Sequence, residues 1–321
     1  MLNEAINLKV KSIIKFDSFR LLLPILILCG SLSVISPNFL TATNLSNILI
    51  NSAPLALAAT GLTLVIICGD LDLSVGSTMA LVSTSSALLM SNFGFPIYIA
   101  FGIGLIVGAL VGFINGLLSV KVNIPSFIVT LAMMSVARGI ALVLSDGSAV
   151  TNLPESVTKI ASGRLLGLSF IIWIPIIIIP IIGFLLSRTV LGLNIYSIGG
   201  NKEAAILAGV PESKTRIMAL TLSGLMAGIA GVISTSRLGV GSPIIAEDLI
   251  LDAIAAVVIG GTSLFGGIGK ISGTIFGVLL IAIIKNGLVL LNVSPFYQRV
   301  AIGIVILIAS VFDAMGRRNK K

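Results

Sequence analysis

Long apolar runs separated by short polar segments dominate the chain. The runs lie near residues 20–36, 47–68, 73–92, 95–119, 124–144, 168–187, 216–237, 248–265, 271–292 and 297–313. Most of them approach the roughly 20 residues that a helix needs to cross about 30 Å of hydrocarbon. The pattern therefore predicts an all-α polytopic membrane protein with about ten transmembrane helices.

Two places leave the predicted number of spans between about nine and eleven. The runs on either side of Gly69–Ser74 fit two spans, or one broken helix with a re-entrant piece. The run at 248–265 is short for a span. The first run follows several lysines, as in a signal peptide, but no convincing small-residue cleavage site follows it, so we expect a true span there.

Composition agrees with a membrane protein, and the charge distribution gives its orientation. The chain is 56% hydrophobic and 10% charged, whereas about 25% of residues in soluble domains are charged. Most of the 20 lysines and arginines fall in segments that share one side with the N-terminus, which predicts cytoplasmic termini in a bacterial cytoplasmic membrane. This bias accounts for the net charge of +8. We therefore expect membrane lipid around the chain and no nucleic-acid partner.

No polar domain interrupts the spans. We therefore expect one transmembrane domain over residues 1–321, with short cytoplasmic tails at 1–19 and 314–321 and a cytoplasmic loop at 188–215. Glycines spaced as small-xxx-small, such as Gly108/Gly112 and Gly224/Gly228, predict close helix packing. The segments 114–127 and 285–296 share Asn-Gly-Leu, Asn and Pro-Phe, which fits either an inverted internal repeat or a chance match.

Several kinds of chemistry are missing from the sequence. The chain has no histidine, which removes the commonest general base and metal ligand. We therefore predict no catalytic residue and no metal site. The segment "GGIGKIS" at 266–272 resembles a phosphate-binding loop, but Leu264 and Ile271 stand where that motif needs glycine and a hydroxyl residue. We expect no cofactor on this chain, and any ATP must be bound by another subunit.

The loop at 188–215 carries "GGNKEAAILAGV", residues 199–210. Glycines before this stretch and Pro211 after it predict a brief helix between two spans. Asn201, Lys202 and Glu203 would be exposed on it, and its alanines with Leu207 would form a small apolar face. Such a helix suits docking into a groove on a soluble partner.

At this point the sequence resembles a known family. Glu203, Ala204, Ala205 and Gly209 resemble the coupling motif of permease subunits of bacterial ABC importers, which contacts the ATP-hydrolysing subunit. "LDLSVGS" (71–77) and "LDAIAAVVIGGTSLFGGIGKISGT" (251–274) resemble segments of the ribose-, xylose- and galactoside-type sugar permeases. The similarity runs from about Ser36 to Asp313. It implies an ABC importer permease fold, an ATPase subunit, an extracytoplasmic sugar-binding protein and a second permease copy, as a homodimer.

Polar residues inside the apolar runs are the candidates for the translocation path or for the helix break. A carboxylate in a membrane costs several kcal/mol unless it is buried or functional. Asp70 is a departure from the family pattern, whereas Asp72 fits it. Asp72 could cap a helix, pair with Arg138 or line the path, and Arg138 could pair with Asp72 or Asp252 or contact a sugar. The full set of candidates is Asp70, Asp72, Ser74, Gly76, Asn115, Arg138 and Asn286.

The resemblance implies import of a ribose-like monosaccharide by a subunit that is not itself an enzyme. Within the same class, the ligand could be a signalling furanose, a nucleoside or another sugar. A different class is an ion-coupled secondary carrier that uses Asp70 and Asp72 as its cation or proton site. The segment from Glu203 to Gly209 would have no role in that carrier.

Overall fold

The structure is a computed structural model that describes residues 21–304 and 307. The predicted tails at 1–19 and 314–321 lie outside the described residues. Six described helices are long and apolar enough to cross a membrane. They are α3 (Ala42–Ile67), α5 (Ile97–Lys121), α6 (Ser126–Leu144), α8 (Phe170–Arg188), α11 (Glu212–Leu238) and α13 (Ile271–Leu290).

The prediction of about ten transmembrane helices is not confirmed by helix length. Four further apolar helices are shorter than a span: α2 (Leu22–Ile35), α4 (Val75–Ser91), α9 (Val190–Gly200) and α12 (Leu249–Ile259). Three of them, α2, α4 and α12, lie within predicted spans that extend beyond the ends of each helix. Helix α9 occupies part of the predicted 188–215 loop. Residues 295–304 are helical and include the start of the last apolar run, predicted at 297–313.

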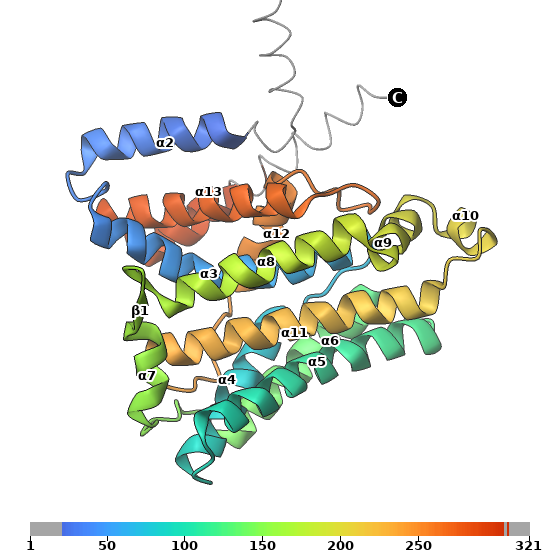
Figure 1. Cartoon of the computed structure of the whole chain (residues 1–321), viewed down its shortest axis with the longest axis horizontal. Helices are drawn as coiled ribbons and strands as arrows, with labels where there is room; N and C mark the ends of the chain where they lie inside the picture. Colours follow the sequence, from blue (N-terminus) through green and yellow to red (C-terminus); the bar gives the residue numbers. More distant parts are fainter. Residues whose placement is uncertain (1–20, 305–306, 308–321) are drawn as a thin grey trace, which may run out of the picture.

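The long helices lie side by side, and α11 packs against α3, α4 and α5 (Figure 1). Glycines make the α5–α11 contact close, as their spacing predicts. A Cβ atom added to Gly224 would lie 2.8 Å from the backbone nitrogen of Gly112. The backbones of the two helices therefore touch with no side chain between them.

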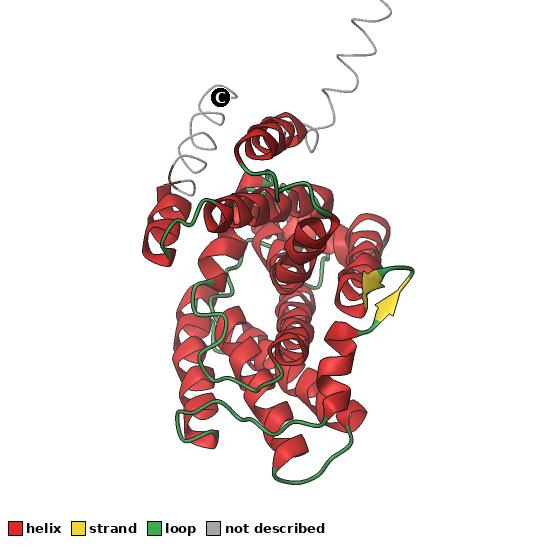
Figure 2. Cartoon of the chain, turned by 90° about the vertical axis from the view of Figure 1, so that its left-hand side faces the viewer, coloured by secondary structure: helices red, strands yellow, loops and turns green. Residues whose placement is uncertain are grey.

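Different small elements mark the two ends of the bundle. One end carries α7 (Glu155–Ser162) and a hairpin of β1 (Arg164–Leu165) and β2 (Leu168–Ser169), and the other carries α10 (Lys202–Leu207) (Figure 1). Figure 2 views the bundle from the hairpin end and places the paired strands at its rim. We call these the α7 end and the α10 end.

Helix α3 ends at Ile67, shortly before the acidic residues Asp70 and Asp72. Gly69 has a φ of +85°, and the Asp70 backbone N–H donates to the Val65 carbonyl, which closes the helix. Residues 68–74, which we call the helix-break segment, are not helical, and α4 begins at Val75. The predicted interruption is therefore present.

Hydroxyl groups of α6 satisfy the backbone of the helix-break segment. Ser126 Oγ accepts the Leu71 N–H at 3.2 Å, and Thr130 Oγ1 donates to the Leu71 carbonyl at 3.2 Å. Non-helical backbone at membrane depth needs such partners because no water is available there. The break is thus built into the packing of α6.

Candidate functional site

Asp72 holds the helix-break segment to two neighbouring helices. Its carboxylate accepts hydrogen bonds from the Ser74 backbone N–H (3.0 Å), the Ser74 hydroxyl (2.6 Å) and the Ser223 hydroxyl on α11 (2.8 Å). The Asn115 amide on α5 donates to the Ser74 hydroxyl at 2.9 Å. The predicted ion pair between Asp72 and Arg138 is wrong, because hydroxyl and backbone donors surround this carboxylate.

Asp70 forms a two-point ion pair with Arg216, near the first turn of α11. Arg216 Nε donates to Asp70 Oδ2 at 2.8 Å, and Arg216 Nη2 donates to Asp70 Oδ1 at 2.7 Å. The Asp70 side chain is buried, and the Arg216 side chain is 11% exposed. Both carboxylate oxygens therefore have a cationic partner, which leaves Asp70 a poor cation site for a secondary carrier. The sequence prediction missed Arg216, although it stands at the start of an apolar run.

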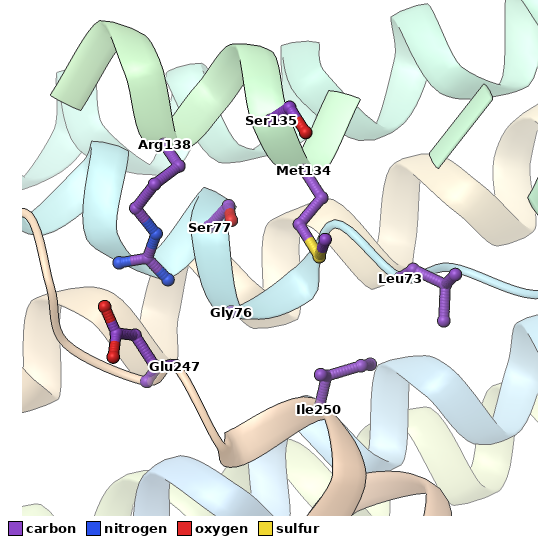
Figure 3. Close-up of a pocket in the computed structure, with 9 residues that line it drawn as sticks. Leu73, Gly76, Ser77, Met134, Ser135, Arg138, Glu247 and Ile250 are labelled. Carbon is purple, nitrogen blue, oxygen red and sulfur yellow. The ribbon is translucent and has the colours of Figure 1, made fainter. Parts of the chain in front are cut away.

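A cavity of about 240 Å³ opens on the other side of the helix-break segment (Figure 3). It lies between the start of α4, the middle of α6 and the start of α12. Its lining is mostly apolar, with a few polar groups. The lining residues are Leu73, Gly76, Ser77, Met134, Ser135, Arg138, Ala246, Glu247 and Ile250. An apolar cavity with few polar groups is typical of small-molecule sites.

Gly76 lets the chain after α11 approach the first turn of α4. A Cβ atom added to Gly76 would collide with the carbonyl oxygen of Ala246. Only glycine allows this backbone contact. The predicted importance of Gly76 in the helix break thus has a steric basis at the cavity wall.

Arg138 reaches across the cavity from α6 and holds the segment before α12. One of its amino groups donates to the backbone carbonyls of Pro243 and Ile245, the latter at 3.0 Å. The predicted carboxylate partners are wrong, because Asp252 pairs with Lys285 of α13 instead. A guanidinium group has five N–H donors, so the two carbonyls leave other donors of Arg138 available at the cavity.

Glu247 supplies an acidic group to the same cavity. Its side chain and that of Arg138 approach one another in Figure 3. The sequence places Glu247 directly before Asp248, at the start of the apolar run at 248–265. The structure pairs Asp248 with Arg299 at 2.7 Å and places Glu247 at the cavity. No sequence signal separated these two neighbours.

The predicted short helix is present as α10, and its ends have the expected chemistry. Asn201 caps it, because the Asn201 side chain accepts the Ala204 N–H at 3.0 Å. Gly209, with a φ of +81°, ends it, and the N–H groups of Gly209 and Val210 donate back to the helix. These two residues of the predicted coupling set therefore shape the helix.

The exposed side of α10 differs from the predicted alanine face. Ala205 is buried in the core, whereas Ala204 and Glu203 are exposed. Leu207 is 89% exposed and Ile206 is 46% exposed. The exposed apolar surface of α10 therefore includes Leu207, as predicted, and Ile206, which the sequence pattern did not single out.

The two asparagines of the suspected repeat have different surroundings. Asn115 belongs to the helix break, where it bonds Ser74. Asn286 on α13 exchanges two hydrogen bonds with Asn44 at the start of α3, at 2.8 and 3.0 Å. Asn286 therefore lies apart from the cavity, and the internal repeat stays a prediction. Within residues 21–304 and 307, no group of three or more His, Cys, Asp or Glu could hold a metal ion.

Comparison with known proteins decides the family. A family model described as branched-chain amino acid transport system, permease component, matches residues 44–310. The chain belongs to this permease family. The match covers the helix-break segment, the cavity and α10, so the site described above lies within the shared fold.

Individual relatives of the permease match over nearly its whole length. The ribose import permease RbsC of Haemophilus influenzae is 37% identical over 98% of this chain and 97% of its own. RbsC of Bacillus subtilis is 43% identical over 91% of both chains. The L-arabinose permease AraH of Azospirillum brasilense is 39% identical over 92% of this chain and 87% of its own. No solved structure matches. The predicted resemblance is confirmed.

Proposed function

We propose that this permease is the membrane-spanning subunit of an ABC importer for a monosaccharide, ribose or a similar pentose. The observation that carries this proposal is the match to ribose and arabinose permeases along almost the entire chain. An ATPase subunit would dock on α10, and an extracytoplasmic binding protein would deliver the sugar at the α7 end. ATP would be hydrolysed by the partner, with no cofactor on this chain.

In this proposal the α10 end faces the cytoplasm and the chain lies in the bacterial cytoplasmic membrane. The basic residues that bias the topology include Lys202, Lys214 and Arg216, which lie at or near α10. The exposed Ile206 and Leu207 next to Glu203 give a small amphipathic contact, which suits a groove on a soluble subunit. Two copies of the permease, a homodimer, would enclose the path.

The cavity at the helix break supplies the contact with the sugar. Arg138 offers donors and Glu247 offers acceptors at one wall, and Ser77 and Ser135 add hydroxyl groups. Sugar hydroxyls donate and accept at once, so a facing pair of opposite charge suits them. The remaining wall is apolar, which keeps the contact weak enough for release. Selectivity would then rest mainly on the binding protein.

A second candidate substrate is L-arabinose, because arabinose permeases match as well as ribose permeases do. The chain itself gives no residue that favours one pentose over the other. A signalling furanose or a nucleoside remains a further alternative within the same machinery.

The test is uptake of labelled sugar into proteoliposomes that hold the permease with its ATPase and binding protein. We expect ribose uptake that needs ATP and ignores proton and sodium gradients. Glu203→Ala and Leu207→Ser, both at exposed positions of α10, should reduce uptake by weakening ATPase docking. The exposed Ser213→Ala serves as the control. Uptake that follows an ion gradient without ATP would contradict the importer, and uptake of arabinose alone would correct the substrate.

A further inference from the structure

We propose that a chain of charges from Lys202 through Glu212 and Arg216 to Asp70 positions the helix-break segment according to the state of α10. This inference rests on the proposed importer function and adds how the ATPase site acts on the cavity. The four residues are positioning residues, since none of them lines the cavity. We call them the charge relay.

The contacts of the relay are continuous from α10 to the helix break. Lys202 Nζ on α10 lies 2.8 Å from Glu212 Oε1, and Arg216 Nη1 donates to the same oxygen at 3.0 Å. Arg216 then binds both oxygens of Asp70 through its other nitrogens. Ser119 on α5 fixes the guanidinium further, by accepting from Nη2 at 3.0 Å. Each member except the two terminal ones bridges two charges.

Exposure falls steadily along the relay. The Lys202 side chain is 49% exposed, Glu212 19%, Arg216 11% and Asp70 6%. The Lys202 end is therefore open to a docked partner, whereas the Asp70 end is shielded from water. Charge interactions strengthen as water is excluded. A shift of Lys202 or Glu212 therefore changes the electrostatic interaction between Arg216 and Asp70.

Glycine backbones connect the same two places. Gly199, at the end of α9 just before α10, packs against the Ile67 carbonyl so closely that a Cβ atom would collide with it. The Gly267 N–H donates to that Ile67 carbonyl at 2.8 Å, and a Cβ on Gly266 would lie 3.0 Å from the Gly69 Cα. We call this contact the glycine junction. Because these glycines have no side chains that could adjust, a displacement of α10 also moves the residues that precede Asp70.

The far end of the helix-break segment forms the cavity wall. Leu73, Gly76 and Ser77 line the cavity, a few residues after Asp70 (Figure 3). Asp72 lies between Asp70 and these lining residues, and its carboxylate accepts a hydrogen bond from Ser223 of α11. A movement of Asp70 with Arg216 therefore changes the position of the cavity wall relative to Arg138 and Glu247 on the opposite side.

Stability alone does not account for such a relay. A buried ion pair recovers its desolvation cost only with good geometry, and apolar replacements of similar volume are often as stable. The two-point Asp70–Arg216 contact fixes direction as well as distance. A geometric role in linking α10 to the cavity explains both the buried charge and its extension to the surface.

The test measures hydrogen–deuterium exchange of amides 71–75 in the permease, free and bound to its ATPase with a non-hydrolysable ATP analogue. In the wild type we expect ATP-bound ATPase to change exchange there by about tenfold, the effect of making or losing one charge-assisted hydrogen bond. Asp70→Asn and Lys202→Gln should both clearly reduce this change while the ATPase stays bound, because only the glycine junction then links the two places. Lys202→Arg, which keeps the charge, should restore it.

The exposed Lys214→Gln on the first turn of α11 is the matched control and should behave as wild type. Lys202→Gln alters a half-exposed side chain, so it remains informative if Asp70→Asn does not fold. A wild-type response that persists in both variants refutes the relay. An ATPase that does not bind the wild type refutes the importer together with the relay. A normal exchange response without pentose uptake refutes only the pentose function.

Discussion

The Ser223 hydroxyl in α11 donates a 2.8 Å hydrogen bond to the Asp72 carboxylate, although the two residues are 151 positions apart. This bond joins the helix-break segment to the helix that packs against α3, α4 and α5. It also makes Asp72 part of the packing between helices, in addition to its local turn with Ser74.

Ser223→Ala should lower the free energy of unfolding by about 2 kcal/mol, because a hydrogen bond to a charged group is lost in a buried site. Asp72→Ala should cost more, since Ser74 and Ser223 then lose their acceptor. The double variant should cost less than the sum. Unfolding by SDS in mixed micelles, followed by circular dichroism, measures all of them. Additive losses would contradict a direct interaction.

Gly76→Ala should disturb the cavity wall, because the new methyl group overlaps the Ala246 carbonyl. We expect a loss of about 1–3 kcal/mol in the free energy of unfolding and reduced sugar uptake. Gly102→Ala in α5 is the control, since nothing lies within 4 Å of its added Cβ atom. Equal behaviour of the two variants would mean that the α4 turn moves freely away from Ala246.

Arg138→Met should release the segment before α12, because the Pro243 and Ile245 carbonyls lose their donor. The amides of residues 244–247 should then exchange faster with deuterium by about tenfold or more, as two partly buried acceptors lose a charged partner. Arg138→Lys should give an intermediate rate, because one ammonium cannot reproduce the planar group. Unchanged exchange in Arg138→Met would contradict this anchoring role.

Asp252→Ala should be destabilising, by about 1–2 kcal/mol, because it removes the partner of Lys285 between α12 and α13, although the Lys285 side chain is 37% exposed and partly solvated. The double variant Asp252→Ala/Lys285→Met should recover much of this loss. The exposed pair of Glu155 and Lys159 in α7 offers a control, and removing it should cost about 0.5 kcal/mol or less. The same SDS titration ranks these variants, and a double variant as unstable as Asp252→Ala would contradict the pairing.

Local signals made α10 predictable from the sequence. Asn201 at the start and Gly209 at the end have side-chain and backbone chemistry that acts within a few residues. The interruption after Ile67 was also predictable, because Gly69 and the acidic residues that follow it indicate a break in the helix. The glycine spacing in α5 and α11 likewise indicated a close contact that the structure confirms.

Partners that are distant along the chain were not predictable in the same way. Arg138 was expected to meet a carboxylate, yet it binds two backbone carbonyls, which every residue possesses and no composition reveals. Asp70 and Arg216 are separated by 146 positions, and several arginines could have served equally well. The predicted number of spans is not confirmed, because three of the apolar runs hold helices of 11 to 17 residues and hydropathy does not report where a helix begins and ends.

Cys68 lies beside the glycine junction, directly before Gly69, and is 3% exposed. Its thiol belongs to the buried apolar cluster next to the junction, so we expect maleimide reagents to reach it only when the neighbouring segments separate. Once Cys29 is replaced by serine, the rate of Cys68 alkylation becomes a measure of how often this junction opens. The chain thus contains its own chemical reporter for movement between α10 and the helix break, with no label introduced.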